Sequence, residues 1–195
     1  DQLEQYSIVH PNSNGIVIDM IHPSHYPFVP GITRDNNDNI MENHDIPDFQ
    51  YDRPELQLTR MESFKNKYQW LPSIFHVDDE KVTLKSYIND LFIPNAELLL
   101  NVQRIICRFF EVAICLFDKI NEHIAFPLDT DSLYHRDLQV IVKAATYKLN
   151  PGEEFEGVWH VEGVPNEHII ATSILYYHDE LPDVPSLAFR REVTH

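Results

Sequence analysis

Hydrophobic residues recur with a helical period in one long stretch, residues 95–120. Its apolar positions are three or four residues apart and include Leu98, Val102, Ile105, Ile106, Phe109, Val112, Ala113, Leu116 and Ile120. This spacing is typical of an α-helix with one apolar face. Asn95 can cap the amino-terminal end, and Glu97 complements the helix dipole in the first turn. The pattern therefore predicts a long amphipathic helix whose apolar stripe packs against a sheet.

From residue 137 onward the pattern changes to short segments in which apolar and polar residues alternate. Three of these segments predict strands, at residues 137–149, 158–163 and 168–177, and another strand begins within residues 186–190. Turn signals separate them, the clearest being NPG at residues 150–152. Successive short strands joined by such turns are typical of a β-sandwich or barrel.

The remaining part of the chain, residues 1–94, is expected to form a loop-rich flank of a single domain that spans residues 1–195. Within this flank the sequence favours short strands at residues 15–21 and 81–88 and an irregular stretch at residues 69–79. The helix at 95–120 and the strands within 137–195 complete the predicted α+β architecture.

Composition narrows the function classes. The formal net charge of −16 repels phosphate backbones, so nucleic-acid binding is not expected. The most apolar run, residues 98–117, is interrupted by charged and amide residues, and neither a membrane span nor a signal peptide is expected. Cys107 and Cys115 are separated by about 12 Å along the predicted helix, too far for a disulfide. Two free thiols favour an intracellular location, cytoplasmic or nuclear.

The main candidate for chemistry is the pair His160 and Glu162 on the predicted strand 158–163. Alternate side chains of a strand point to the same face, so the imidazole and the carboxylate are expected to project together. A neutral imidazole and a carboxylate are two of the three ligands of a non-haem Fe(II) facial triad. The alternative is a structural role without a metal, in which His160 and Glu162 form a hydrogen-bonded polar pair on a half-exposed sheet.

The spacing alone is not specific, because the same histidine-x-acid spacing recurs at three other places. These are His76/Asp78, His135/Asp137 and His178/Glu180. The first two are interpreted as loop or loop-to-strand positions. His22 and His25 stand among prolines that exclude a helix interior, and they are interpreted as loop histidines rather than a metal pair.

The context of the His160 pair resembles a known family. The stretches that carry the resemblance are WHVEG at 159–163, NEHIIAT at 166–172, QVIVK at 139–143 and the tyrosines at 176–177, with softer matches at 22–34, 69–75 and 86–89. They are similar to a largely fungal family filed as a domain of unknown function. Its members look like distant relatives of the Fe(II)/2-oxoglutarate dioxygenases.

The resemblance implies a double-stranded β-helix core of the jelly-roll or cupin type, backed by the long helix. It implies Fe(II) bound by His160 and Glu162, 2-oxoglutarate as co-substrate, and oxidation of an organic substrate, either a small molecule or a protein. Lys143 is the candidate for a co-substrate carboxylate, although an exposed lysine is the alternative. Tyr147 and Thr172 are candidates for the pocket wall. His168 can touch the site or cap a turn.

In these dioxygenases a third metal ligand, a histidine, and a basic residue that binds 2-oxoglutarate follow on later strands. The chain ends at residue 195, before that part of the pattern. A second polypeptide, or a second copy of this chain, is therefore expected to complete the barrel. Alternatively, the chain is a fragment of a longer protein or a degenerate relative of these enzymes. The alternative function is a non-catalytic β-barrel interaction protein, and zinc-dependent hydrolysis is a more distant one.

Overall fold

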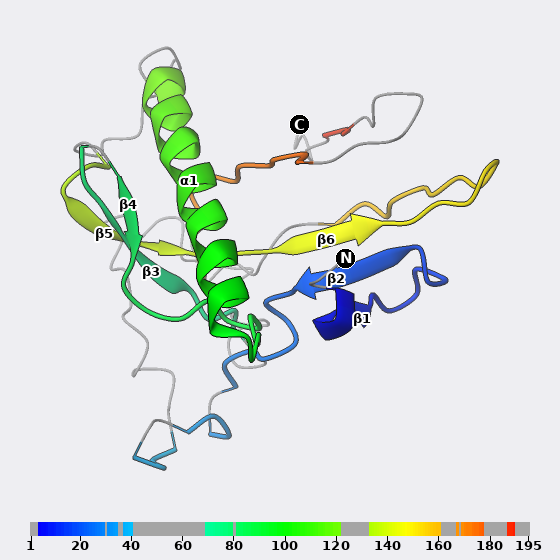
Figure 1. The fold of residues 1–195 in the computed structure, drawn as a ribbon, viewed down its shortest axis with the longest axis horizontal. Helices are drawn as coiled ribbons and strands as arrows, with labels where there is room; N and C mark the ends of the chain where they lie inside the picture. Colours follow the sequence, from blue (N-terminus) through cyan, green and yellow to red (C-terminus); the bar gives the residue numbers. More distant parts are fainter. Residues whose placement is uncertain are drawn as a thin grey trace, which may run out of the picture.

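The fold is seen in a computed structural model that describes residues 4–29, 31–34, 37–40, 69–79, 81–121, 133–160, 167, 169–177 and 187–189. Figure 1 shows its elements coloured along the chain. In chain order they are the 3-10 helix η1 (Glu4–Tyr6), β1 (Ile8–Val9), β2 (Val17–Ile21), β3 (Ser73–Val77), β4 (Val82–Leu84), α1 (Ala96–Asn121), β5 (Arg136–Val140) and β6 (Ala144–Tyr147).

The strands form two three-stranded sheets, with the orders β1-β2-β6 and β4-β3-β5. Every pairing in both sheets is antiparallel. β5 and β6 follow one another along the chain, yet β5 pairs with β3 and β6 pairs with β2. Residues 141–143 therefore carry the chain from one sheet to the other, as Figure 1 shows.

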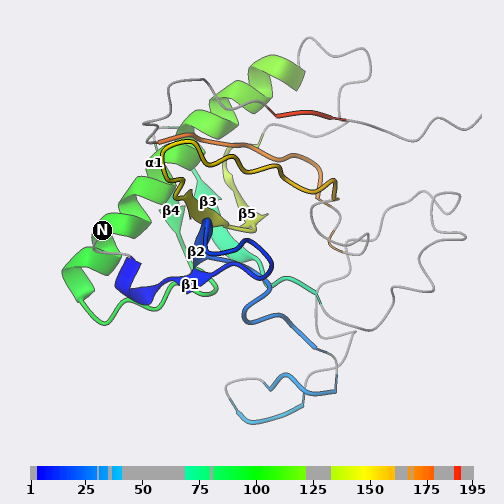
Figure 2. The same cartoon turned by 90° about the vertical axis from the view of Figure 1, so that its right-hand side faces the viewer.

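The core lies between α1 and the strands, and Phe75 is at its centre. Phe75 is fully buried, and its ring meets that of Phe110 on α1 edge-on, with centroids 5.3 Å apart. Strand β3 alternates buried and half-buried residues, so one of its faces packs inward. Ile21 of the other sheet belongs to the same hydrophobic cluster. In Figure 2, α1 runs diagonally along one side of the strands.

The predicted helix is confirmed as α1, together with its cap. The side-chain oxygen of Asn95 accepts a hydrogen bond of 2.9 Å from the backbone N–H of Leu98, and Glu97 lies in the first turn. The apolar stripe of α1 is only partly buried. Ile105 is 66% exposed, whereas Val102 and Ile114 are buried. Apolar residues occupy more of the helix circumference than the single sheet beneath it covers.

The short strands expected at 15–21 and 81–88 are confirmed as β2 and β4. The irregular stretch expected at 69–79 was wrong, because its centre forms β3, the middle strand of its sheet. The single strand expected at 137–149 is instead two strands, β5 and β6, because the chain changes sheets between them.

The strands expected after residue 150 are not formed in the described residues. Residues 158–160, 169–177 and 187–189 have no strand assignment, and the rest of those predicted segments lies outside the described residues. A strand needs a hydrogen-bonded neighbour along its length, and no described segment supplies a ladder there. The α+β class is confirmed, with two antiparallel sheets and one α-helix; the described residues do not form a closed barrel.

Within the part of the chain that the structure describes, no helix has both the length and the apolar content needed to cross a membrane.

The cap of α1 gives a first prediction. Asn95→Ala removes the acceptor for the Leu98 N–H and is expected to lower the free energy of unfolding by about 1 kcal/mol. Asn101→Ala is the control, because Asn101 lies within the same helix and is exposed. Alanine has the higher helix propensity there, so this variant is expected to be as stable as the parent chain or slightly more stable. Urea unfolding measures both. Equal losses in the two variants would contradict a capping role for Asn95.

Candidate functional site

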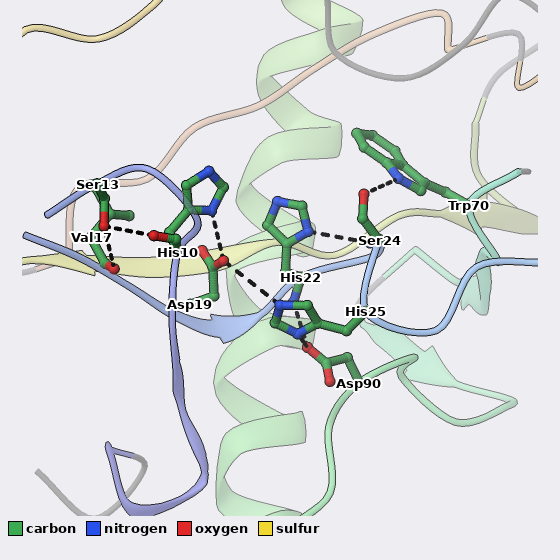
Figure 3. Close-up of polar contacts among 9 residues, drawn as sticks. All are labelled: His10, Ser13, Val17, Asp19, His22, Ser24, His25, Trp70 and Asp90. Atoms are coloured by element: carbon green, nitrogen blue, oxygen red, sulfur yellow. Dashed lines mark hydrogen bonds and ion pairs between the residues drawn. The ribbon is translucent and has the colours of Figure 1, made fainter. Parts of the chain in front are cut away.

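Five ionisable side chains gather where β2 leaves its sheet, and we call them the imidazole–carboxylate cluster: His10, Asp19, His22, His25 and Asp90. Figure 3 shows the rings of the three histidines around the carboxylate of Asp19. His10 follows β1, Asp19 is the middle residue of β2, and the other two histidines lie in the loop after β2. Asp90 lies in the turn after β4.

The β1–β2 hairpin brings His10 to Asp19. The two strands pair antiparallel, and the His10 N–H donates to the carbonyl of Val17 at 2.9 Å. The connecting turn uses Gly15 with φ +83°, a conformation that suits glycine. Buried Ser13 donates its hydroxyl to the carbonyl of His10 at 2.8 Å. The turn is thus held from within, and it fixes the position of the His10 backbone.

Asp19 is a carboxylate in a core position. In β2 the residues Val17, Asp19 and Ile21 share the buried face, and Asp19 is only 2% exposed. The Nδ1–H of His10 donates to its Oδ2 at 2.7 Å, and the Nε2 of His25 lies 3.8 Å from the same oxygen. A buried charge is costly unless it is paired and hydrogen-bonded, so these imidazoles are what allows a carboxylate at this position.

Asp90 holds the loop that carries His22 and His25. Its Oδ2 accepts the backbone N–H of His22 at 2.8 Å and lies 2.7 Å from Nδ1 of His25. Asp90 has φ +66°, a left-handed conformation that aspartate tolerates better than most residues. His25 therefore lies between two carboxylates, with one ring nitrogen facing each.

His22 is the most enclosed imidazole of the cluster, at 9% exposure. Its Nδ1 accepts the backbone N–H of Ser24 at 3.2 Å, so the neutral ring carries its hydrogen on Nε2. Burial lowers the pKa of His22 below its usual value; the charges of Lys143, His25 and His10 lower it further, and Asp19 opposes them. His22 is thus a neutral imidazole beside a carboxylate.

Trp70 covers His22. The indole meets the His22 ring edge-on with centroids 6.5 Å apart, and its Nε1–H donates to the hydroxyl of Ser24 at 2.8 Å. The backbone N–H of Trp70 donates to Glu167 at 2.6 Å. Segments that are distant in sequence therefore meet at this loop.

The cluster contains a set of groups that could hold a metal ion. One ligand atom each from His10, Asp19 and His22 lie within 4.8 Å of one another. Two imidazoles and a carboxylate form a donor set that suits first-row transition metals such as zinc and iron.

Comparison with known families identifies the chain. A model of the family DUF4246, described as a protein of unknown function, matches residues 1–127 and 119–195. The chain belongs to the DUF4246 family. The matched residues include both the imidazole–carboxylate cluster and the WHVEG stretch. Comparisons with curated proteins and with solved structures give no match.

The structure of the DUF4246 chain places some of the sequence-predicted site residues near the cluster. Lys143 is exposed and lies in the crossover between the two sheets, where its charge acts on His22. Tyr147 pairs with Val17 across the sheet, so it shares the face of Asp19; its ring packs edge-on against Phe155 at 5.5 Å.

The remaining predicted site residues follow β6 in the chain. His160 is exposed, and its Nδ1 lies 2.7 Å from the carbonyl oxygen of Val158. Thr172 is exposed. Glu162 and His168 lie outside the described residues.

Sequence reasoning missed the cluster in the DUF4246 chain. The sequence pattern places His22 and His25 in a loop, and His10, Asp19 and Asp90 belong to no motif. One signal was present, because a charged residue at a buried position of an apolar strand needs a partner. Two of the histidines with the His-x-acid spacing also contact carboxylates other than those two residues along the chain. His76 meets Asp137 across β3 and β5 at 2.6 Å, and His135 lies 3.0 Å from Asp79.

The lowered pKa of His22 predicts a pH dependence of stability. Because the pKa of the folded state lies below that of the unfolded state, the unfolded chain binds more protons between the two values. Stability is therefore expected to fall as the pH drops below about 6.5, until the pKa of the folded state is passed. His22→Asn keeps an acceptor for Ser24 but cannot titrate, so it should weaken this dependence.

Urea midpoints measured from about pH 5 to pH 8 check this prediction. His135→Asn is the matched control, because His135 is exposed and has φ +59°, which asparagine tolerates. An unchanged pH profile in His22→Asn would contradict the assignment.

Proposed function

We propose that this DUF4246 protein is an Fe(II)/2-oxoglutarate-dependent dioxygenase-like protein that oxidises an organic substrate. His160 and Glu162 are the two metal ligands that this chain contributes. The support comes from the WHVEG and NEHIIAT stretches and from one observation about His160.

That observation is the hydrogen bond that sets the tautomer of His160. A carbonyl oxygen only accepts, so the Nδ1–H of His160 donates to Val158 at 2.7 Å. The lone pair of the neutral ring is therefore on Nε2. Histidines that bind metals usually donate their other ring N–H to a carbonyl or carboxylate, which fixes the ring for coordination. His160 thus has the tautomer and the exposure that fit an iron ligand.

A bound Fe(II) would couple the oxidative decarboxylation of 2-oxoglutarate by O₂ to transfer of one oxygen atom to the substrate. The chain's own residues position the reactants. His160 and Glu162 would hold the ion. Lys143 would pair with a carboxylate of the co-substrate, and Tyr147 and Thr172 would line the pocket, with His168 beside them. Tyr147 is the last residue of β6, and Lys143 directly precedes the first residue of that strand.

A facial triad needs a third ligand beyond these two residues. We propose that a second polypeptide or a second copy of the chain supplies it and completes a double-stranded β-helix around β6. An intracellular location is part of the proposal, because both Cys107 and Cys115 are free thiols.

A second candidate function is a non-catalytic interaction protein with the same fold. It is favoured by large apolar side chains that are exposed near the carboxyl-terminal end of the described residues. Val158 is 81% exposed and Phe189 is 86% exposed, and Tyr176 and Tyr177 are also exposed. Large exposed apolar side chains are typical of interaction sites where they form one patch.

Anaerobic titration with Fe(II) or Mn(II), with and without 2-oxoglutarate, distinguishes the two functions. The parent chain is expected to bind the ion, more tightly with 2-oxoglutarate present. His160→Ala should weaken binding at least about tenfold, because it removes a ligand. Fluorescence of Trp159, the neighbour of His160, reports the binding directly in a Trp70→Phe background.

His76→Gln is the matched control. His76 is an imidazole paired with the carboxylate of Asp137 within the sheet β4-β3-β5. It should bind iron as the parent chain does. Binding that is absent from the parent chain, or unaffected by His160→Ala, would reject the iron site and favour the interaction protein.

A further inference from the structure

We propose that His10, Asp19 and His22 form a binding site for a divalent transition-metal ion of the zinc class, separate from the iron position proposed at His160. The proposal goes beyond the oxygenase function and does not depend on it. It rests on the geometry and charge of the imidazole–carboxylate cluster.

The three ligand atoms are close to the separation that one ion requires. They lie within 4.8 Å of one another, and two ligands that are each about 2.1 Å from a tetrahedral zinc are about 3.4 Å apart. The longest separation in the cluster must therefore shorten by about 1.4 Å when an ion binds. His10 can supply this movement, because its side chain is 38% exposed while that of Asp19 is 2% exposed.

The hydrogen bond between His10 and Asp19 occupies the position that an ion would take. The Nδ1–H of His10 bridges to Oδ2 of Asp19 over 2.7 Å. A metal ion replaces such a proton and coordinates both atoms, since ligands must lose their protons to bind. The displaced hydrogen can move to Nε2 of His10, which leaves the ring neutral.

His25 and Asp90 give the cluster a second feature of metal sites. The Nδ1–H of His25 donates to Asp90 at 2.7 Å, which leaves its Nε2 directed toward Asp19 at 3.8 Å. A carboxylate that orients a histidine whose other nitrogen faces an ion is the usual outer arrangement around zinc. His25 is thus placed to supply a fourth ligand, and Asp90 is its positioning residue.

The local charge also favours a cation. Two carboxylates, Asp19 and Asp90, lie beside the imidazoles, and the positive charge of Lys143 acts on His22 in the opposite sense. With neutral imidazoles the local charge is therefore negative. Nitrogen donors favour zinc, cobalt, nickel or copper over calcium and magnesium, which prefer oxygen ligands.

The two tryptophans of the chain make the test specific to position. Trp70 packs against His22, whereas Trp159 adjoins His160. In a Trp159→Phe background the remaining indole reports on the cluster. Co(II), a paramagnetic quencher, is expected to quench the emission of Trp70 saturably, and added Zn(II) should displace the Co(II) and restore the emission.

His10→Gln in the same background should weaken Co(II) binding at least tenfold, because it removes one ligand. Its ring is partly exposed, so this variant is expected to fold even if Asp19→Asn does not; circular dichroism and the urea midpoint without metal check both. His76→Gln and His160→Ala should leave the Trp70 response unchanged.

Three results would overturn the proposal. They are the absence of saturable quenching in the parent background, equal affinity in His10→Gln, and loss of the Trp70 response in His160→Ala. The last of these would place the ion at His160 instead. The iron titration uses Trp159 and a different variant, so either proposal can fail without the other.

Discussion

The backbone pairing of residues 136–147 is the constraint on which the rest of the structure depends. Its first half forms the edge of one sheet by pairing with β3, and its second half forms the edge of the other by pairing with β2. Backbone N–H and C=O groups must find partners, so each half is fixed by its own ladder. The two sheets are tied together by one short piece of chain, and Ile21 of one joins the core around Phe75 of the other.

Asp19 shows how this arrangement creates a site. A strand that faces a core normally carries apolar residues at every second position, and β2 breaks that rule at its centre. The register between β2 and β6 shifts between Asp19 and Ile21, and such irregularities bend a strand and redirect the residues beside it. The cluster is thus assembled by the hairpin before β2, the loop after it and the turn after β4. His160, by contrast, lies on an exposed stretch without strand pairing.

The sequence was a good guide where a feature depends on neighbouring residues. The period of α1, its cap at Asn95 and the short strands β2 and β4 all depend on local spacing and turn residues. β3 was missed because SIFHV is short and is followed by acidic residues that are typical of a loop. Only pairing on both sides made it a central strand. The cluster depends on contacts across the fold, such as that of His25 with Asp90, and local patterns do not encode these.

The crossover at residues 141–143 sets a length requirement on the chain, because it joins two ladders in different sheets. Side chains of a strand alternate between faces, so one inserted residue here would keep β5 in place and turn β6 over. The hydroxyl of Thr146 contacts the sulfur of Met20 and the hydroxyl of Tyr177. After such an insertion Thr146 would point to the face of the sheet that Tyr147 occupies, and Tyr147 to the face of Thr146. The turn at residues 150–152, which begins after both ladders end, can change length without moving either sheet. Evolution of this chain is therefore expected to tolerate insertions in the turn after β6 and to reject them within the crossover.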